Sequence, residues 1–198
     1  MKKILIDLGH PAHIHYFRNT IKDLEGKGYK FKIIARDKEV LQDLLKEYDF
    51  AYVNRGKGKN SLLGKMWYTL YADLIVLIQA LMFRPNIFLS FASPYAAQVA
   101  WLLRKPHIAM DDTEHATLGR LMYAPFSKTI LNPNFYKKRF SDKQFFFDSY
   151  TELFYLHPDY HTPNPEIIKQ YNLDVNDKYF ILRLVAWNAS HDIGHQGL

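Results

Sequence analysis

The sequence predicts an α/β protein with a doubly wound, mainly parallel Rossmann-like sheet. Apolar runs of strand length alternate with stretches of helical periodicity, the runs are apolar throughout, and glycine or proline stands at several of the joints. Strands that are apolar on both faces and separated by helices indicate a parallel sheet with right-handed crossovers. We therefore expect helices on both faces of the sheet.

The expected elements alternate regularly along the first two thirds of the chain. Strands are expected at 4–8, 31–35, 87–91 and 107–110, with two weaker ones at 128–131 and 152–155. Helices are expected at 12–27, 38–48, 63–83 and 94–104. Gly28 is placed to end the first helix, and Pro85 and Pro106 fall just before strands. Together these elements form one domain over residues 1–160.

The remainder of the sequence predicts a linker and the start of a second domain. The stretch 157–165 is rich in proline, which removes a backbone donor and does not continue a helix. We expect a linker with a short helix, 166–171, over residues 161–177. A strand at 179–185 then leads into a polar loop where the sequence stops, and a lone strand cannot bury its faces. Residues 178–198 are therefore interpreted as the first strand and loop of a truncated C-terminal domain.

Composition limits the partners and the compartment. Of the 198 residues 48% are hydrophobic, and the formal net charge of +6 favours anionic partners. The basic residues are spread out, densest over 55–65, and form no stripe with interleaved aromatics, so nucleic acid is not expected. The chain has no cysteine, which rules out disulfides and thiolate chemistry and fits a cytoplasmic protein. The apolar run behind the N-terminal lysines is too short for a signal peptide.

Residues 62–83 are nearly long enough and apolar enough to cross a bilayer. Lys65, Asp73 and Gln79 interrupt the run, and an aspartate in mid-span is costly in lipid. We expect an amphipathic helix whose apolar face packs on the sheet. The alternative is a helix that lies on a membrane surface, because Trp67, Tyr68 and Tyr71 cluster beside basic residues.

Four polar segments are expected to meet at one edge of the sheet, because ligands of open α/β sheets bind beyond the carboxyl ends of the strands. Gly9 to His15 joins a strand to a helix N-terminus, which favours an anion, and adds three histidines. Ser93 and Pro94 suit the N-cap and first position of the next helix. The other two segments are 111–115 and 190–195, the latter across a cleft.

Within these segments His13 is the preferred general base, since a neutral imidazole accepts a proton from a hydroxyl group. The alternative is that His13 has only a structural role. His10 likewise has a structural alternative, in which it caps the helix. Asp111, Asp112, Glu114 and His115 form a denser group, in which neighbouring carboxylates raise one another's pKa and so suit acid and base work. The alternative interpretation is that these residues have a structural role, as an N-cap and a network of surface salt bridges.

Several cofactor signatures are absent. His191 and His195 have the i, i+4 spacing of metal ligands, but the sequence has no H-E-x-x-H pattern and Gly194 weakens a helix there, so no metal is expected. The first loop lacks G-x-G-x-x-G, which argues against a dinucleotide. Gly64-Lys65-Met66 lacks the hydroxyl of a Walker A motif. No cofactor is expected.

The motifs at 9–15, 93–95, 111–115 and 189–195 together resemble an uncharacterised family of glycosyltransferase-like proteins, a domain of unknown function. Its members occur in archaea and bacteria, often among surface-polysaccharide genes. The resemblance implies the GT-B architecture, in which two Rossmann-like domains flank a cleft. It also implies that this chain is mainly the N-terminal, acceptor-side domain, inactive alone, and that the donor is a nucleotide-sugar.

Two known GT-B families are related. The loop Gly9 to His13 resembles the first loop of the peptidoglycan N-acetylglucosaminyltransferase, which implies a sugar or lipid-linked acceptor and contact with the membrane periphery. The segment 113–120 resembles a motif of the UDP-N-acetylglucosamine 2-epimerases, although its histidine and glutamate are swapped. The epimerases' catalytic aspartate is also missing from the turn that Ser93, Pro94 and Tyr95 occupy. Epimerase chemistry is thus one alternative, and a non-catalytic sugar-nucleotide-binding module is the other.

The resulting hypothesis is an inverting, metal-independent glycosyltransferase. His13 is its expected base, with Asp112 and Glu114 as assisting acids or hydroxyl binders. The residues expected to bind substrate are Gly9, His10, Ser93, Pro94, His115, Ser190 and His191.

Overall fold

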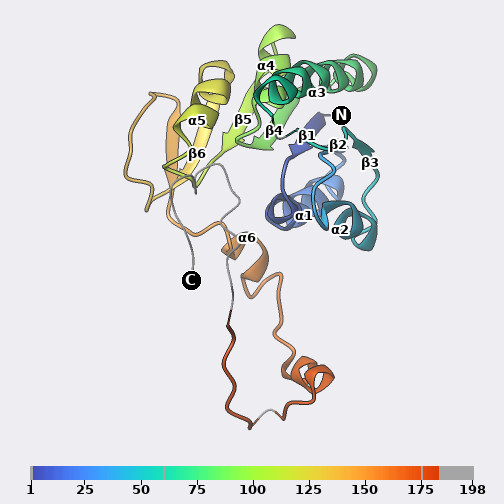
Figure 1. The fold of residues 1–198 in the computed structure, drawn as a ribbon, viewed down its shortest axis with the longest axis vertical. Helices are drawn as coiled ribbons and strands as arrows, with labels where there is room; N and C mark the ends of the chain where they lie inside the picture. The colour runs from blue at the N-terminus through green and yellow to red at the C-terminus, as the bar shows by residue number, and fades with distance from the viewer. Residues whose placement is uncertain (1, 60, 175, 183–198) are drawn as a thin grey trace. The chain divides into compact units, whose positions relative to one another are not determined.

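The computed structural model describes residues 2–59, 61–174 and 176–182. Its contacts divide the chain into two compact units, Met1–Leu156 and His157–Leu198. The first unit holds the sheet and its helices (Figure 1). Residues 183–198, which include the end of the strand expected at 179–185 and the whole loop with Ser190 and His191, lie outside the described residues.

The first unit is built on a seven-stranded parallel sheet in the order β3-β2-β1-β4-β5-β6-β7. The strand order reverses between β1 and β4, which is the switch point where open α/β sheets bind ligands. The strands are β1 Lys3–Leu8, β2 Lys30–Ala35, β3 Tyr52–Asn54, β4 Ile87–Phe91, β5 His107–Met110, β6 Thr129–Pro133 and β7 Gln144–Phe147. This confirms the predicted doubly wound α/β fold.

Helices cover both faces of the sheet (Figure 1). On one face, Ile4, Ile6 and Leu8 of β1 pack in a cluster with α1 and α2. On the other, Leu5 of β1 packs in a cluster with Val76 of α3 and with α4. The strand is therefore apolar on both sides, as the sequence predicts. The helices are α1 Pro11–Glu25, α2 Leu41–Glu47, α3 Leu62–Phe83, α4 Pro94–Leu102, α5 Thr117–Tyr123 and α6 Leu153–Leu156.

The ends of α1 and α4 follow the local sequence. His10 caps α1 by accepting a hydrogen bond from Ala12 N at 3.2 Å, and Ser93 caps α4 by accepting one from Ala96 N at 3.3 Å. Proline follows each cap, at the position that has no use for its own N–H. The first helix ends at Glu25, and Gly28 takes the left-handed φ of 82° in the turn that leads to β2.

One expected element has the wrong type. Residues 152–155, predicted as a strand, lie largely in the helix α6. The edge of the sheet is already occupied by β7, which the sequence analysis missed. A helical turn instead lets Phe154 pack on Phe147 of β7 and lets Asn19 of α1 donate to its carbonyl at 2.8 Å.

The second unit has little regular structure over its described residues. Pro165–Tyr171 forms a 3₁₀ helix where a short helix was predicted, with Asn164 as its N-cap. Residues 178–182 form no strand, and Phe180 is 99% exposed. The predicted strand at 179–185 is therefore wrong over its described part, because these apolar residues have no covering layer among the described residues.

Candidate functional site

A cavity of about 240 Å³ lies at the carboxyl ends of β1 and β4, where the N-termini of α1 and α4 meet. The loop after β1 supplies Gly9, His10 and His13 to its wall, and the turn after β4 supplies Ser93 and Pro94. The structure thus brings together five of the residues predicted to form the site. The remaining lining residues are Arg36, Arg55, Phe91, Ala92 and Tyr95.

A buried ion pair lies behind the wall of this pocket, which it joins through Arg55. Asp7 is the penultimate residue of β1 and is fully buried, and Arg55 is 2% exposed. Arg55 donates from Nε to Asp7 Oδ1 at 2.8 Å and from Nη2 to Oδ2 at 3.3 Å. Ser93 donates its hydroxyl to the same Oδ2 at 2.5 Å. The carboxylate is therefore fully engaged, and it ties the turn after β4 to β1.

Aromatic side chains hold the Arg55 guanidinium in place. Arg55 donates to the hydroxyl of Tyr68 on α3, which in turn donates to the carbonyl of Gly56 at 3.1 Å. The ring of Tyr95 lies 4.6 Å from the guanidinium carbon, at cation–π distance. Burial lowers the pKa of Arg55, but the charge and hydrogen bond of Asp7, together with Tyr68 and Tyr95, outweigh it and leave the pKa raised. Arg55 is thus a fixed cation in the pocket wall.

Arg36 differs from Arg55 because its charge has no carboxylate partner within the described residues. It follows β2 directly, and its Nε is buried without a hydrogen-bond partner in that part of the chain. A Cβ on Gly58 would overlap the Arg36 guanidinium, so glycine at this position lets the side chain reach the pocket. Arg36 is the pocket cation left available to a ligand.

His13 is neutral and its ring is oriented by the backbone. Its Nδ1 accepts a hydrogen bond from Gly9 N at 3.2 Å, so the proton of the neutral ring resides on Nε2. Burial, followed by nearby His10 and Lys38, lowers the pKa of His13 to about 3. The ring also lies 4.9 Å from that of Phe91. In this arrangement His13 is a hydrogen-bond donor.

A second buried network supports the turn that carries Ser93. Ser127 donates to the Tyr123 carbonyl at 2.9 Å and so accepts from His107 Nδ1 at 2.9 Å. His107 Nε2 then accepts from the hydroxyl of Ser90 at 2.9 Å, and Ser90 accepts from Ser93 N at 3.1 Å. Burial lowers the pKa of His107 to about 3, in agreement with a neutral ring.

The segment after β5 is a separate polar cluster. Asp111 is buried and accepts from the Tyr123 hydroxyl at 2.5 Å and from Thr113 N at 2.9 Å. Burial raises the pKa of Asp111. Glu114 accepts from the backbone N–H groups of Lys137 and Lys138, so its carboxylate fastens two loops together.

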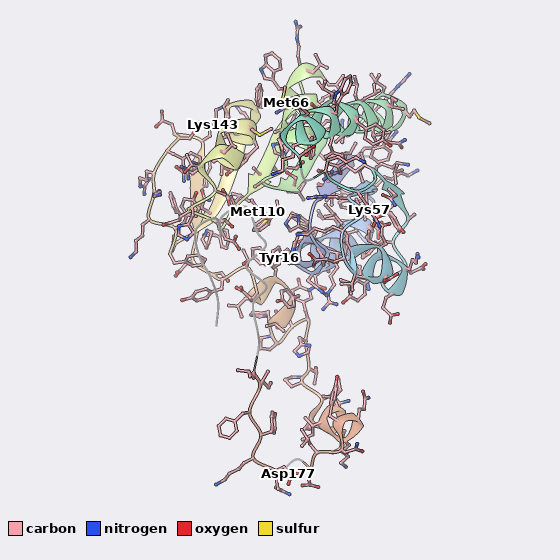
Figure 2. All side chains as sticks on the ribbon, in the orientation of Figure 1. Tyr16, Lys57, Met66, Met110, Lys143 and Asp177 are labelled. Carbon is pink, nitrogen blue, oxygen red and sulfur yellow. The ribbon has the colours of Figure 1, made fainter. Side chains whose placement is uncertain are left out.

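Asp112 and His115 are more accessible. Asp112 accepts from Thr113 Oγ1 at 3.0 Å and from Thr151 Oγ1 at 3.1 Å. His115 is exposed in the turn before α5. Tyr16 of α1, labelled in Figure 2, connects the two clusters, since its ring lies 5.1 Å from that of Phe91 and the Asp112 charge helps to raise its pKa after burial.

The sequence analysis missed two cations that line the pocket and the buried carboxylate behind them. Asp7 is a charged residue inside the otherwise apolar strand β1, and it pairs with Arg55 without lining the cavity. Arg36 and Arg55 follow the ends of β2 and β3, and β3 has only three residues and was not predicted. Within the described residues no group of three or more His, Cys, Asp or Glu side chains could hold a metal ion.

The fold is the Rossmann-like α/β fold of the GT-B proteins. MurG of Acinetobacter baumannii aligns with a TM-score of 0.61 and 12% identity, over 74% of this chain and 45% of that one. The UDP-GlcNAc 2-epimerase of Methanocaldococcus jannaschii, solved with UDP-GlcNAc and UDP, aligns with a TM-score of 0.58 and 16% identity over 73% and 46%. The Streptomyces glycosyltransferase SsfS6 aligns with a TM-score of 0.52 and 12% identity over 67% and 50%.

The chain belongs to the family described as "Protein of unknown function (DUF354)", which matches residues 2–196. The uncharacterized protein MJ0665 of Methanocaldococcus jannaschii is 30% identical over 132 residues, which are 66% of this chain and 38% of the relative. The chain therefore spans half or less of the length of these proteins. This family membership confirms the resemblance inferred from the four motifs.

Proposed function

We propose that this chain is the acceptor-side half of a GT-B glycosyltransferase that uses a nucleotide-sugar donor, and that the pocket between β1 and β4 binds an anionic acceptor. The observation that carries the proposal is the unpaired charge of Arg36 beside two helix N-termini. Asp7 is neutralised by Arg55, so the lining carries a positive excess. A phosphate-bearing sugar, free or linked to a lipid, fits this chemistry.

His13 acts in this proposal as a neutral donor. Its Nε2–H can bond a sugar hydroxyl or a phosphate oxygen, while Nδ1 stays on Gly9 N. The predicted role as general base would require the other tautomer and the loss of that hydrogen bond. Substitution by glutamine separates the two roles, because glutamine keeps an N–H donor and cannot serve as a base. Its neighbours Gly9 and His10 shape the loop, and Pro94 begins the helix that faces it.

The polar cluster after β5 supplies the sugar-binding part of the proposal. Asp112, with Thr151 and the ring of Tyr16, lies beside the pocket on the same edge of the sheet. Carboxylates and aromatic faces are suitable partners for sugar hydroxyls and C–H groups. Glu114 is assigned to loop anchoring. Three further substrate contacts remain predictions: Ser190 and His191, which would bind the donor, and the exposed His115.

Isothermal titration with N-acetylglucosamine 1-phosphate, UDP-GlcNAc and N-acetylglucosamine tests the pocket. We expect the two phosphate-bearing sugars to bind and free N-acetylglucosamine not to bind. Arg36→Gln should weaken binding about tenfold or more, since a hydrogen bond to a charged group contributes about 1.5–3 kcal/mol. Arg104→Gln, an exposed arginine outside the pocket, is the matched control. Equal affinities for wild type and Arg36→Gln would refute the assignment.

The 2-epimerase alternative shares the fold and predicts a different reaction. It requires UDP-GlcNAc to change without an acceptor, whereas a transferase moves the sugar to a second molecule. Incubation with labelled UDP-GlcNAc, with and without a lipid-phosphate acceptor, separates the two. A lipid-linked acceptor also implies contact with the membrane periphery, where the outer side of α3 offers an apolar surface.

A further inference from the structure

The outer side of α3 is apolar along its length. Nine large hydrophobic side chains on this helix are at least 41% exposed, and Trp67 and Met82 reach 73% and 75%. They recur every three or four residues and so form one stripe, about 30 Å long at 1.5 Å per residue. The members of this stripe, called the α3 stripe below, are Leu63, Met66, Trp67, Leu70, Tyr71, Leu74, Ile78, Leu81 and Met82.

The helix does not have the burial of a core helix. Its inner side packs through Tyr68, Ala72, Val76 and Ala80. One described helix, Leu63–Phe83, is long and apolar enough by length and composition to cross a membrane, yet only 22% of its most apolar window is buried. Val76 and Ala80 pack in one core cluster with α4 and the sheet, so the helix cannot leave the sheet to span a bilayer without unfolding this core.

The apolar surface continues onto α4. A groove of about 430 Å³ between α3 and α4 is lined by Leu74 and Leu77 on one side and by Trp101 and Leu102 on the other. Trp101 is 62% exposed. An apolar surface of this extent on one side of a domain marks an interaction surface.

Charge identifies the partner. Residues 50–110 contain seven Lys and Arg residues and one acidic residue, Asp73, a net charge of +6 that equals that of the entire chain. Arg55 is buried and paired, and the other six cations are exposed. Lys57, Lys59 and Lys65 precede or begin α3, and Arg84 follows it, so cations flank both ends of the stripe. Figure 2 labels Lys57 in the loop before α3 and Met66 on the helix itself.

We propose that the α3 stripe and its flanking lysines dock this protein on the surface of an anionic phospholipid bilayer, with α3 lying in the plane of the interface. Apolar side chains of a surface-lying helix enter the boundary between headgroups and acyl chains, while basic residues bind the anionic headgroups. A second copy fits poorly, because two surfaces that each carry six exposed cations would repel each other. The proposal concerns a different surface from the pocket and holds whether or not the pocket binds a sugar phosphate.

Vesicle sedimentation tests the docking. The probes are vesicles of phosphatidylcholine alone and vesicles with about 30% phosphatidylglycerol. We expect binding to the anionic vesicles and little to the neutral ones. Lys57→Glu/Lys59→Glu/Lys65→Glu should weaken binding about 100-fold or more, since each basic residue near an anionic surface contributes about fivefold. Lys22→Glu/Lys27→Glu/Lys30→Glu makes the same change in net charge at exposed sites elsewhere and is the control.

The stripe is tested separately. Trp67→Ser/Leu70→Ser/Leu74→Ser should abolish sedimentation with vesicles, while the matched variant Phe145→Ser/Tyr150→Ser/Leu156→Ser, also at exposed apolar positions, should retain it. In a Trp101→Phe/Trp187→Phe background, the fluorescence emission of Trp67 should shift to shorter wavelength on anionic vesicles.

Absence of vesicle binding by the wild type, or an equal loss of binding in both triple-serine variants, would overturn the proposal. So would a dimer in lipid-free solution that the stripe variant dissociates. Arg36→Gln should leave vesicle binding unchanged. This variant therefore distinguishes a failure of the membrane-docking proposal from a failure of the proposal that the pocket binds a sugar phosphate.

Discussion

The segments at the carboxyl ends of β1 and β5 look alike in sequence, since each places a buried aspartate close to a histidine, Asp7 before His10 and Asp111 before His115. The two aspartates nevertheless have different partners. Asp7 is neutralised by the guanidinium of Arg55 and by the hydroxyl of Ser93. Asp111 is satisfied by a tyrosine hydroxyl and a backbone N–H group. The end of β1 thus uses a cation that directly follows the distant strand β3, and the segment after β5 uses neutral donors.

This difference decides what each loop offers to a ligand. Around Asp7 the acceptors are occupied, and the helix N-termini and Arg36 remain as positive groups along the cavity. In the segment after β5, Asp111 and Glu114 are engaged within the protein, and Glu114 fastens the loop at 137–138. A cluster of carboxylates in sequence therefore does not by itself define an acid–base site, because its acceptors can serve to hold loops.

The largest expected effect comes from breaking the ion pair behind the pocket wall. Arg55→Met should lower the free energy of unfolding by about 3–5 kcal/mol, because it leaves the buried Asp7 carboxylate without its cation. Urea denaturation measures the loss, with exposed Lys27→Met as the control. The double variant Asp7→Asn/Arg55→Met should recover part of the stability, since it removes the uncompensated charge as well. A loss below about 1 kcal/mol in the single variant would contradict the buried-pair interpretation.

Removing the corresponding partner of Asp111 should lower the free energy of unfolding by a smaller amount. Tyr123→Phe removes the hydroxyl that donates to Asp111 and should lower the free energy of unfolding by about 2 kcal/mol. Backbone donation from Thr113 still stabilises the carboxylate. Denaturation of Tyr171→Phe, an exposed tyrosine, provides the reference. If Tyr123→Phe proved as costly as Arg55→Met, the distinction between charged and neutral partners would not hold.

Much of the fold was predictable because it depends on local pattern. The four strands at the centre of the sheet are largely apolar on both faces. The cap predicted for Ser93, and the cap considered as the alternative role of His10, depend on residues within three positions of each other. The elements that the sequence missed are β3, β7 and α5, which are three, four and seven residues long. Such short segments carry too little periodicity to distinguish strand from turn, and tertiary packing determines them.

The pocket was predictable in part for the same reason. Gly9, His13 and Ser93 stand in recognisable turns next to strong strands. The pairing of Asp7 with Arg55 joins residues 48 apart and depends on β3, so no local pattern announces it. The tautomer of His13 depends on the direction of the Gly9 N–H group, which only the folded loop fixes.

The network behind Ser93 should make stability depend on pH. The pKa of buried His107 is about 3, below the ordinary 6.5, so the unfolded chain binds a proton first as the pH falls. His107 therefore reduces the free energy of unfolding by about 1.4 kcal/mol per pH unit below pH 6.5, down to about pH 3. Asp73, whose pKa is raised to about 6, has the opposite effect, so wild type and variant must be compared.

His107→Gln should remove this contribution to the slope of the free energy of unfolding against pH between pH 6.5 and 5. This expectation does not depend on how much the substitution lowers the free energy of unfolding at pH 7. Urea denaturation at several pH values measures the slope, and exposed His161→Gln should leave it unchanged. An identical slope in wild type and His107→Gln would show that His107 is not held neutral by burial.

The smallest expected effect concerns Glu114, where loop anchoring and catalysis predict different results. Glu114→Gln keeps an acceptor oxygen for the N–H groups of Lys137 and Lys138 but removes the charge, so it should cost about 1 kcal/mol at most. Hydrogen exchange at these two amides should accelerate, while exchange at Gly9 N, which donates to His13, should not change. Unchanged exchange at 137–138 would leave the Glu114 carboxylate free for the acid role that the sequence predicts, and the loop after β5 would then have to be counted with the pocket.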